Sequence, residues 1–350
     1  MAMNFKEGRW NHEINVTDFV KTNITPYEGD ASFLVGPTER TKAVWNKCLE
    51  ALAEERANNG VRSLDPSTVS TITSFAPGYI DKENEVIVGL QTDEVLRRAI
   101  KPFGGIKVVE KACRENGVEV DPKVKDIFTH YRKTHNDGVF DAYTEEIRSF
   151  RSLGFLTGLP DNYARGRIIG DYRRLALYGL DRLIEAKQND LRHLTGPMTD
   201  ARIRLREEVA EQIKALKEIK IMGEQYGLEL GRPAHNAQEA VQWVYMAYLA
   251  AVKEQDGAAM SLGNVSSFLD IYIEYDMAHG LLDEAHAQEL IDQFVIKLRM
   301  VRHLRMQAYT DIFAGDPTWV TESIGGRFND GRTKAVSYTH LRAHETDSYL

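Results

Sequence analysis

The sequence is poor in cysteine, with only Cys48 and Cys113 among its 350 residues. The two do not form a CxxC pair, and a disulfide framework would need more of them. A small disulfide-stapled secreted domain is therefore excluded, and a reducing cytoplasm fits best. Neither cysteine has a histidine at a readable spacing, so we expect both thiols to be unreactive.

A long apolar run and an excess of positive charge are also missing. The first residues, MAMNFKEGRWNHE, contain no apolar run of the kind found in secretory signals. The most apolar stretch, AVQWVYMAYLAAV at 240–252, is shorter than the roughly 20 residues of a membrane-spanning helix and predicts a buried helix. Because 52 acidic residues outnumber 44 basic ones, for a net charge of −8, a nucleic-acid-binding protein is disfavoured.

Most of the chain carries helix-forming patterns. Capped apolar periodicities predict helices at about 37–60, 121–131, 171–188, 199–226, 236–252 and 283–306. Asn236 and Glu239 have the spacing of a capping box. Residues 266–277, SSFLDIYIEYDM, fit a half-buried strand and a helical face equally well. Arg299, Arg302 and Arg305 recur every third residue, so they could form a basic stripe along one side of a helix or pair with acidic neighbours.

The stretch TGLPDNYARGRIIGDYRR at 157–174 places Arg165 and Arg167 on either side of Gly166. A guanidinium matches a carboxylate or phosphate with two parallel hydrogen bonds, and a glycine lets the backbone approach a ligand. The alternative is a structural ion pair with a helix carboxylate such as Asp171. The local sequence is compatible with both roles, ligand binding and a structural ion pair.

Two other stretches contain small residues or aromatic residues beside turns. DGAAMSLGNVSSF at 256–268 matches no phosphate-binding glycine motif, so a tight junction between a loop and a helix is the simpler interpretation. FAGDPTWVTESIGG at 313–326 flanks a turn with Phe313 and Trp319, which fit core packing or a ligand-binding wall. His340 and His344 lie four apart without a metalloprotease glutamate, so we expect no metal site.

These stretches occur in one order along residues 10–333, together with NITPYEGDASFL, STITSFAPGYI, YRKTHNDGVFDAYT and KLRMVRHLR. In this the chain resembles pyruvate formate-lyase, a glycyl radical enzyme. The resemblance implies a helix-rich α/β fold, the N-terminal half of a ten-stranded barrel, with one half-barrel of five strands wrapped in helices. It implies the reversible conversion of pyruvate and coenzyme A to acetyl-CoA and formate in anaerobic glucose fermentation. It also implies a cytoplasmic homodimer and a radical-SAM activating enzyme as a partner.

The resemblance assigns roles to particular residues. Arg167 matches the arginine that binds the pyruvate carboxylate, which leaves Arg165 as structural support. The residues that match the wall of the substrate pocket are Ala258, Phe313 and Trp319. The residues that fall where the family holds the adenine end of coenzyme A are Asn136, Phe140 and Arg151.

The sequence departs from the family in what it lacks. It contains no adjacent Cys-Cys pair and no RVSGY-type radical glycine, so we expect no catalytic residue in this chain and no activity from it alone. Residues 1–333 are expected to form the N-terminal part of the enzyme domain. From Lys334 the resemblance stops, and VSYTHLRAHETDS looks like translated adapter sequence, so 334–350 is expected to be an unrelated tail. A 2-ketobutyrate formate-lyase and a non-catalytic binding or assembly module on the same scaffold are the alternatives.

Overall fold

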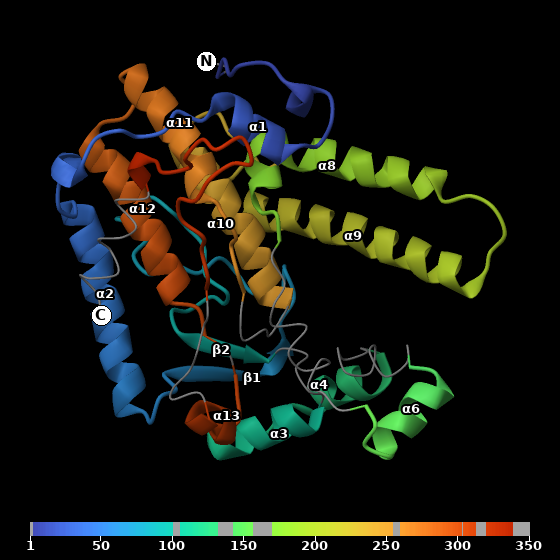
Figure 1. Cartoon of the computed structure of the whole chain (residues 1–350). Coiled ribbons are helices and arrows are strands. Elements are labelled where there is room, and N and C mark those ends of the chain that lie inside the picture. The colour runs from blue at the N-terminus through green and yellow to red at the C-terminus, as the bar shows by residue number, and fades with distance from the viewer. Residues whose placement is uncertain are drawn as a thin grey trace.

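The computed structural model describes residues 3–100, 106–131, 143–156, 170–254, 260–302, 304–312 and 320–338. Helices dominate this part of the chain (Figure 1). The helices are α1 (Val16–Asn23), α2 (Glu39–Ala57), α3 (Ile106–Glu115), α4 (Pro122–Asp126), α6 (Glu145–Ser152), α8 (Arg173–His193), α9 (Asp200–Gln225), α10 (Ala237–Glu254), α11 (Ser266–Ala278), α12 (Glu284–Arg299) and α13 (Gln307–Ile312). Short 3-10 turns span Arg9–Asn11 and Ala31–Phe33, and a π-helical turn spans Ile127–Tyr131.

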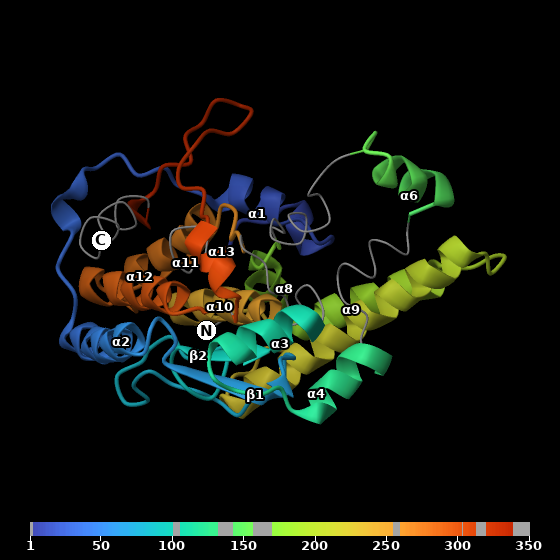
Figure 2. The same cartoon turned by 90° about the horizontal axis from the view of Figure 1, so that it is seen from below.

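The main core forms around α10, the apolar stretch that the sequence predicted to be buried. Its side chains from Ala240 to Met246 are buried, and it packs against α8, α11 and α12. In Figure 2 the layer of α10–α12 lies between α1 on one side and α2 with the strands on the other. Asn236 Oδ1 accepts the Glu239 N–H (2.8 Å), so the expected cap is confirmed.

Helices α8 and α9 form a long antiparallel hairpin that projects from the body (Figure 1). Gly179 interrupts α8 with a φ of +69°, a conformation that disfavours any residue with a Cβ. A Cβ there would lie 2.4 Å from the backbone of Arg232, so the glycine also lets the loop before α10 approach α8 closely. Both helices lie where the sequence predicted them.

Two parallel strands, β1 (Ser63–Val69) and β2 (Arg97–Ile100), make one sheet in the described residues. They pair Ser63 with Arg97 and Val69 with Ile100, with a shift of register between. A second core lies against the sheet, where α3 and α4 contribute Val109, Cys113 and Val124. Of the five strands expected for a half-barrel, the described part of the chain contains these two.

Residues 266–277, which fitted either a strand or a helix, lie within α11 (Ser266–Ala278). Phe268, Leu269, Ile271, Tyr272 and Ile273 are all buried, so the segment is apolar on more than one face. A buried helix needs no polar side, and this is why its sequence also alternated like a strand.

A remote carboxylate on α11 supports the start of α10. Asp276 Oδ2 accepts the Ala237 N–H at 2.6 Å, in addition to the local cap from Asn236. We expect Asp276→Ala to lower the free energy of unfolding by about 1–2 kcal/mol, as the loss of a cap does. Asp276→Asn keeps an acceptor oxygen and should cost less. Urea denaturation measures both, and equal losses for the two variants would contradict this role.

The segment after Thr333 packs against α11. Val336 and Tyr338 are buried in the main core. Asp270 Oδ1 accepts the Ser337 hydroxyl (2.6 Å) and the Tyr338 N–H (3.2 Å). Burial nevertheless raises the pKa of Asp270 to about 7, since these donors only partly oppose it.

The raised pKa of Asp270 predicts a pH dependence of stability. The folded protein holds this proton more tightly than the unfolded chain, where an aspartate titrates near about 4. The stabilisation is therefore complete below that pH and is lost as the pH rises through about 7. We expect the melting temperature to fall between about pH 4 and pH 7, and Asp270→Asn to flatten this slope. An unchanged slope in the variant would assign the effect to another group.

Candidate functional site

The stretches at 256–268 and 313–326 lie side by side in their described parts. Leu262 N–H donates to Thr321 O (2.8 Å) and Ser323 N–H donates to Gly263 O (2.8 Å). Gly263 and Glu322 form a parallel bridge between the two. The backbones therefore pair much as two short strands do, which fixes the register of one stretch against the other.

The end of the arginine stretch joins the same place. Arg173 Nη1 donates to Asn264 O (3.1 Å), and the Asn264 side chain donates to Ser323 O (2.9 Å). Asn264 thus ties the first turn of α8 to both other stretches. Three segments that the sequence singled out separately meet at one site. Sequence reasoning missed Asn264, whose position after Gly263 was the only sign of a turn.

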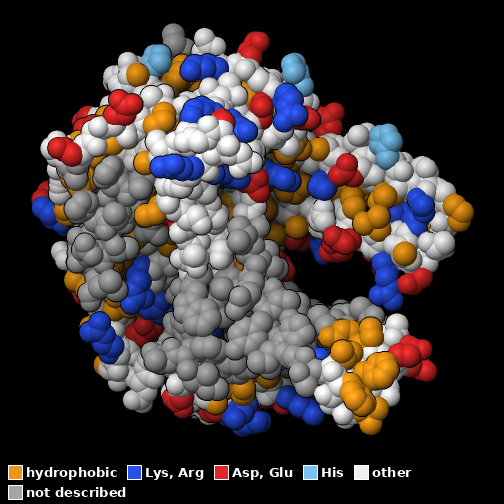
Figure 3. Space-filling model, viewed as in Figure 1, with side chains coloured by type: hydrophobic (Ala, Val, Ile, Leu, Met, Phe, Trp, Pro, Cys, Tyr) orange, Lys and Arg blue, Asp and Glu red, His pale blue; other side chains and the backbone are white. Residues whose placement is uncertain are grey.

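Most of the predicted binding residues lie outside the described residues: Arg165, Arg167, Ala258, Phe313, Trp319, Asn136 and Phe140. Arg151 is described, on α6, with its guanidinium 5.5 Å from the centre of the Tyr143 ring. Exposed apolar side chains gather beside it at Phe150, Leu153 and Phe155 (Figure 3, lower right). A stacked guanidinium next to exposed aromatic rings is a suitable surface for a planar ligand.

The charges around the start of α8 bear on the two readings of the arginine pair. Asp171 Oδ1 lies 2.7 Å from Arg173 Nε, and Asp171 Oδ2 lies 3.4 Å from Arg174 Nε. The nearest candidate partner for a structural ion pair is therefore engaged by the two following arginines.

The two cysteines are unsuited to nucleophilic chemistry. Cys48 on α2 and Cys113 on α3 are both fully buried. Burial raises the pKa of the Cys48 thiol to about 12 and that of Cys113 to about 11. A thiol in such surroundings remains protonated and inert at neutral pH, as the sequence predicted.

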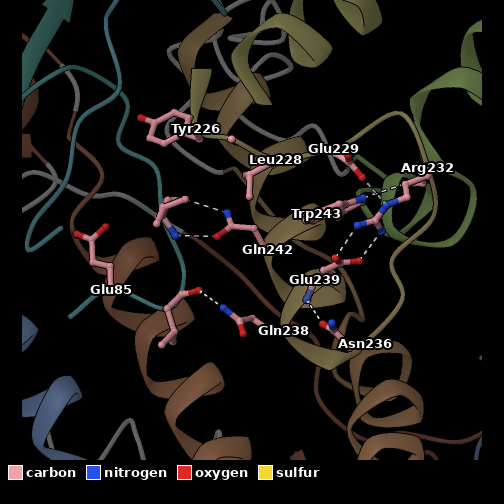
Figure 4. A pocket seen from close by; sticks show the side chains of 13 residues that line it. Glu85, Tyr226, Leu228, Glu229, Arg232, Asn236, Gln238, Glu239, Gln242 and Trp243 are labelled. Atoms are coloured by element: carbon pink, nitrogen blue, oxygen red, sulfur yellow. Dashed lines mark hydrogen bonds and ion pairs between the residues drawn. The ribbon is translucent and has the colours of Figure 1, made fainter. Parts of the chain in front are cut away.

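A cavity of about 480 Å³ opens near the start of α10 (Figure 4). Its polar groups are already paired with protein groups. Glu239 accepts two hydrogen bonds from Arg232 (2.6 and 2.8 Å), and the Gln242 amide pairs with both the N–H and the C=O of Val88. Because these polar groups already have protein partners, we assign the cavity a structural role.

The described residues contain neither a candidate metal site nor a candidate membrane-spanning helix. No group of three or more histidine, cysteine, aspartate or glutamate side chains is placed to hold a metal ion there. Within the same ranges, no helix is both long and apolar enough to cross a membrane.

Comparison with known proteins gives close and distant relatives. A family model described as pyruvate formate lyase-like matches residues 7–346. The formate acetyltransferase of Haemophilus influenzae is 54% identical over 345 residues, which make up 97% of this chain and 45% of that protein. The chain therefore spans about half the length of this relative.

Solved structures share the fold at low sequence identity. The B12-independent glycerol dehydratase of Clostridium butyricum matches with a TM-score of 0.62 and 17% identity, over 89% of this chain and 46% of that one. The hydroxyproline dehydratase of Clostridioides difficile matches with a TM-score of 0.61 and 16% identity, and the coverage of both chains is the same. A glycyl radical enzyme of Archaeoglobus fulgidus matches with a TM-score of 0.53 and 15% identity, over 94% of this chain and 45% of that one. The helix-rich fold class expected from the sequence is thereby confirmed.

Proposed function

Because the chain belongs to the pyruvate formate-lyase-like family, we propose that it is the N-terminal part of a formate acetyltransferase. The observation that carries the proposal is the 54% identity to the Haemophilus influenzae enzyme over 97% of the chain. The reaction is the transfer of the acetyl group of pyruvate to coenzyme A with release of formate. In the family, a glycyl radical and a Cys-Cys pair supply the homolytic cleavage, and this sequence contains neither residue set.

The contribution of this chain is to hold the substrates. Arg167 binds the pyruvate carboxylate through a bidentate contact, and Ala258, Phe313 and Trp319 wall the pocket. The three segments that carry these residues are supported by the hydrogen bonds through Asn264 described above.

Coenzyme A is the proposed second substrate. Asn136, Phe140 and Arg151 bind its adenine end, and the exposed rings beside Arg151 suit a planar base. The complete enzyme is proposed to be a cytoplasmic homodimer that a radical-SAM activating enzyme converts to its active form. These assignments follow from the family resemblance.

Loss of the Arg167 guanidinium should weaken pyruvate binding. A charge-assisted hydrogen bond contributes about 1.5–3 kcal/mol, so we expect Arg167→Ala to raise the dissociation constant roughly 10- to 150-fold. Equilibrium dialysis with labelled pyruvate measures this directly. Arg174→Ala is the matched control, because Arg174 is half exposed and pairs with Asp171. Equal binding by wild type and Arg167→Ala would remove Arg167 from the site.

The alternatives are a 2-ketobutyrate formate-lyase and a non-catalytic module on the same scaffold. Arg167 would serve any 2-keto acid, so competition between pyruvate and 2-ketobutyrate in the same dialysis separates the two enzymes.

We also propose the division of the chain at 333/334, with 334–350 as an unrelated tail. Peptide mass mapping of the native protein tests it: peptides from 335–350 would support a true short chain, and peptides of a longer enzyme would support truncation.

A further inference from the structure

Four cationic side chains are buried in the described part of the chain: Arg98, Lys253, Lys297 and Arg302, with 5%, 2%, 1% and 3% of their surface exposed. Three of them have a carboxylate partner. Lys297 Nζ lies 2.9 Å from Glu85 Oε2, and both arginines contact Glu55. Among the described residues, Lys253 alone of the four has no hydrogen bond or ion pair from its side chain.

The position of Lys253 is fixed by its surroundings. It lies in the last turn of α10, next to the buried Val252. Ser70 Oγ donates to the Lys253 carbonyl oxygen (2.6 Å), and Glu254 Oε1 accepts the Ile72 N–H (3.1 Å). These hydrogen bonds hold the end of α10 against the residues that follow β1. Lys253 is therefore buried at an ordered helix end and not at a frayed one.

A buried ammonium without a counterion is unfavourable, because it has lost its hydration and gained no partner. Burial lowers the pKa of Lys253 to about 8, although the neighbouring Glu254 carboxylate acts in the opposite direction. The side chain therefore still carries its charge on most molecules at pH 7. Such a charge is stabilised when an anion binds to it.

We propose that Lys253 is an anion-binding residue and that its ligand is the carboxylate of a small acid. A lysine ammonium acts as a compact point charge, and its deep burial suits a small anion better than a bulky, strongly hydrated phosphate ester. The choice of acid rests on the proposed function, which supplies a 2-keto acid and formate. Ala258, to which that function assigns the substrate pocket, follows only five residues later in the chain.

The test uses the whole chain and measures binding, not acyl transfer. Thermal melts are recorded with increasing sodium formate, sodium pyruvate or inorganic phosphate at constant ionic strength. We expect formate and pyruvate to stabilise the wild type, and Lys253→Met to weaken both affinities tenfold or more. Without an anion, Lys253→Met should melt at a higher temperature than the wild type, because it removes an unpaired buried charge. Lys253→Arg should retain binding, and Lys217→Met, on the exposed face of α9, should match the wild type.

Equal stabilisation of wild type and Lys253→Met by formate would overturn the proposal, as would a response to phosphate alone. If Lys253→Met does not fold, reductive methylation of the wild type followed by peptide mass spectrometry gives the answer. Formate should then protect Lys253 and leave Lys217 unaffected, and equal labelling of Lys253 with and without formate would refute it. Arg167→Ala separates the two proposals: binding that needs Lys253 but not Arg167 would refute only the proposed function.

Discussion

A protein of this sequence, incubated anaerobically with the activating enzyme, pyruvate and coenzyme A, is expected to release no formate and to show no glycyl radical signal. The reason is that the only two cysteines of this sequence are neither adjacent nor reactive. Cys48 and Cys113 lie on different helices, both are buried, and burial raises the pKa of each thiol far above neutral pH. Neither can replace a pair of adjacent, reactive cysteines.

The loss of activity is expected to be complete, because the missing groups are the ones that form and carry the radical. The Haemophilus influenzae relative, activated in parallel, is the positive control for the activating enzyme and the assay. Formate or an electron paramagnetic resonance signal above background from this chain would show that it carries a radical relay of its own.

The largest effect on stability is expected at Glu55, the carboxylate shared by two buried arginines. Arg302 Nε and Nη2 lie 2.8 and 3.0 Å from its two oxygens, and Arg98 Nη2 lies 3.5 Å from Oε1. Glu55→Gln removes the carboxylate that pairs with the buried Arg302 and one carboxylate contact of the buried Arg98. Removing one partner of a buried ion pair costs about 3–5 kcal/mol, so we expect a loss of this size in urea denaturation.

Glu54→Gln is the matched control, one residue away on the same helix. Its carboxylate contacts Arg62 at 2.6 Å, but the Glu54 side chain is more than half exposed, and Arg62 also pairs with Glu94. An exposed pair contributes at most about 1 kcal/mol. Similar losses for the two variants would mean that the Glu55 cluster contributes no more than a surface ion pair.

Local features of the fold could be predicted from the sequence. The helices at 199–226 and 236–252 were predicted correctly because their caps and apolar faces depend on residues that are close together in the sequence. The support of α10 by Asp276 and the partner of Arg302 could not be found, because each depends on a residue far away in the chain. The sequence left a basic stripe and acidic partners open for the arginines around 302, and the structure pairs Arg302 with Glu55.

The sequence indicated the three stretches of the candidate site, but it did not show that they lie together. Local patterns marked the three stretches, but their convergence needs long-range backbone pairing between 262–263 and 321–323. Asn264 gave no sign of its role, because an asparagine after a glycine is typical of any turn. Lys253 lay within an apolar helix, and only the structure shows that, among the described residues, it lacks the carboxylate partner that Arg98, Lys297 and Arg302 have.

The central claim is that this chain is the substrate-binding N-terminal part of a formate acetyltransferase. The most direct measurement joins residues 1–333 to the part of the Haemophilus influenzae enzyme that this chain does not match, and assays the activated chimera. Our account predicts formate and acetyl-CoA from pyruvate and coenzyme A, with the activity lost on Arg167→Ala. A folded chimera that carries the glycyl radical but forms no formate from pyruvate would contradict it.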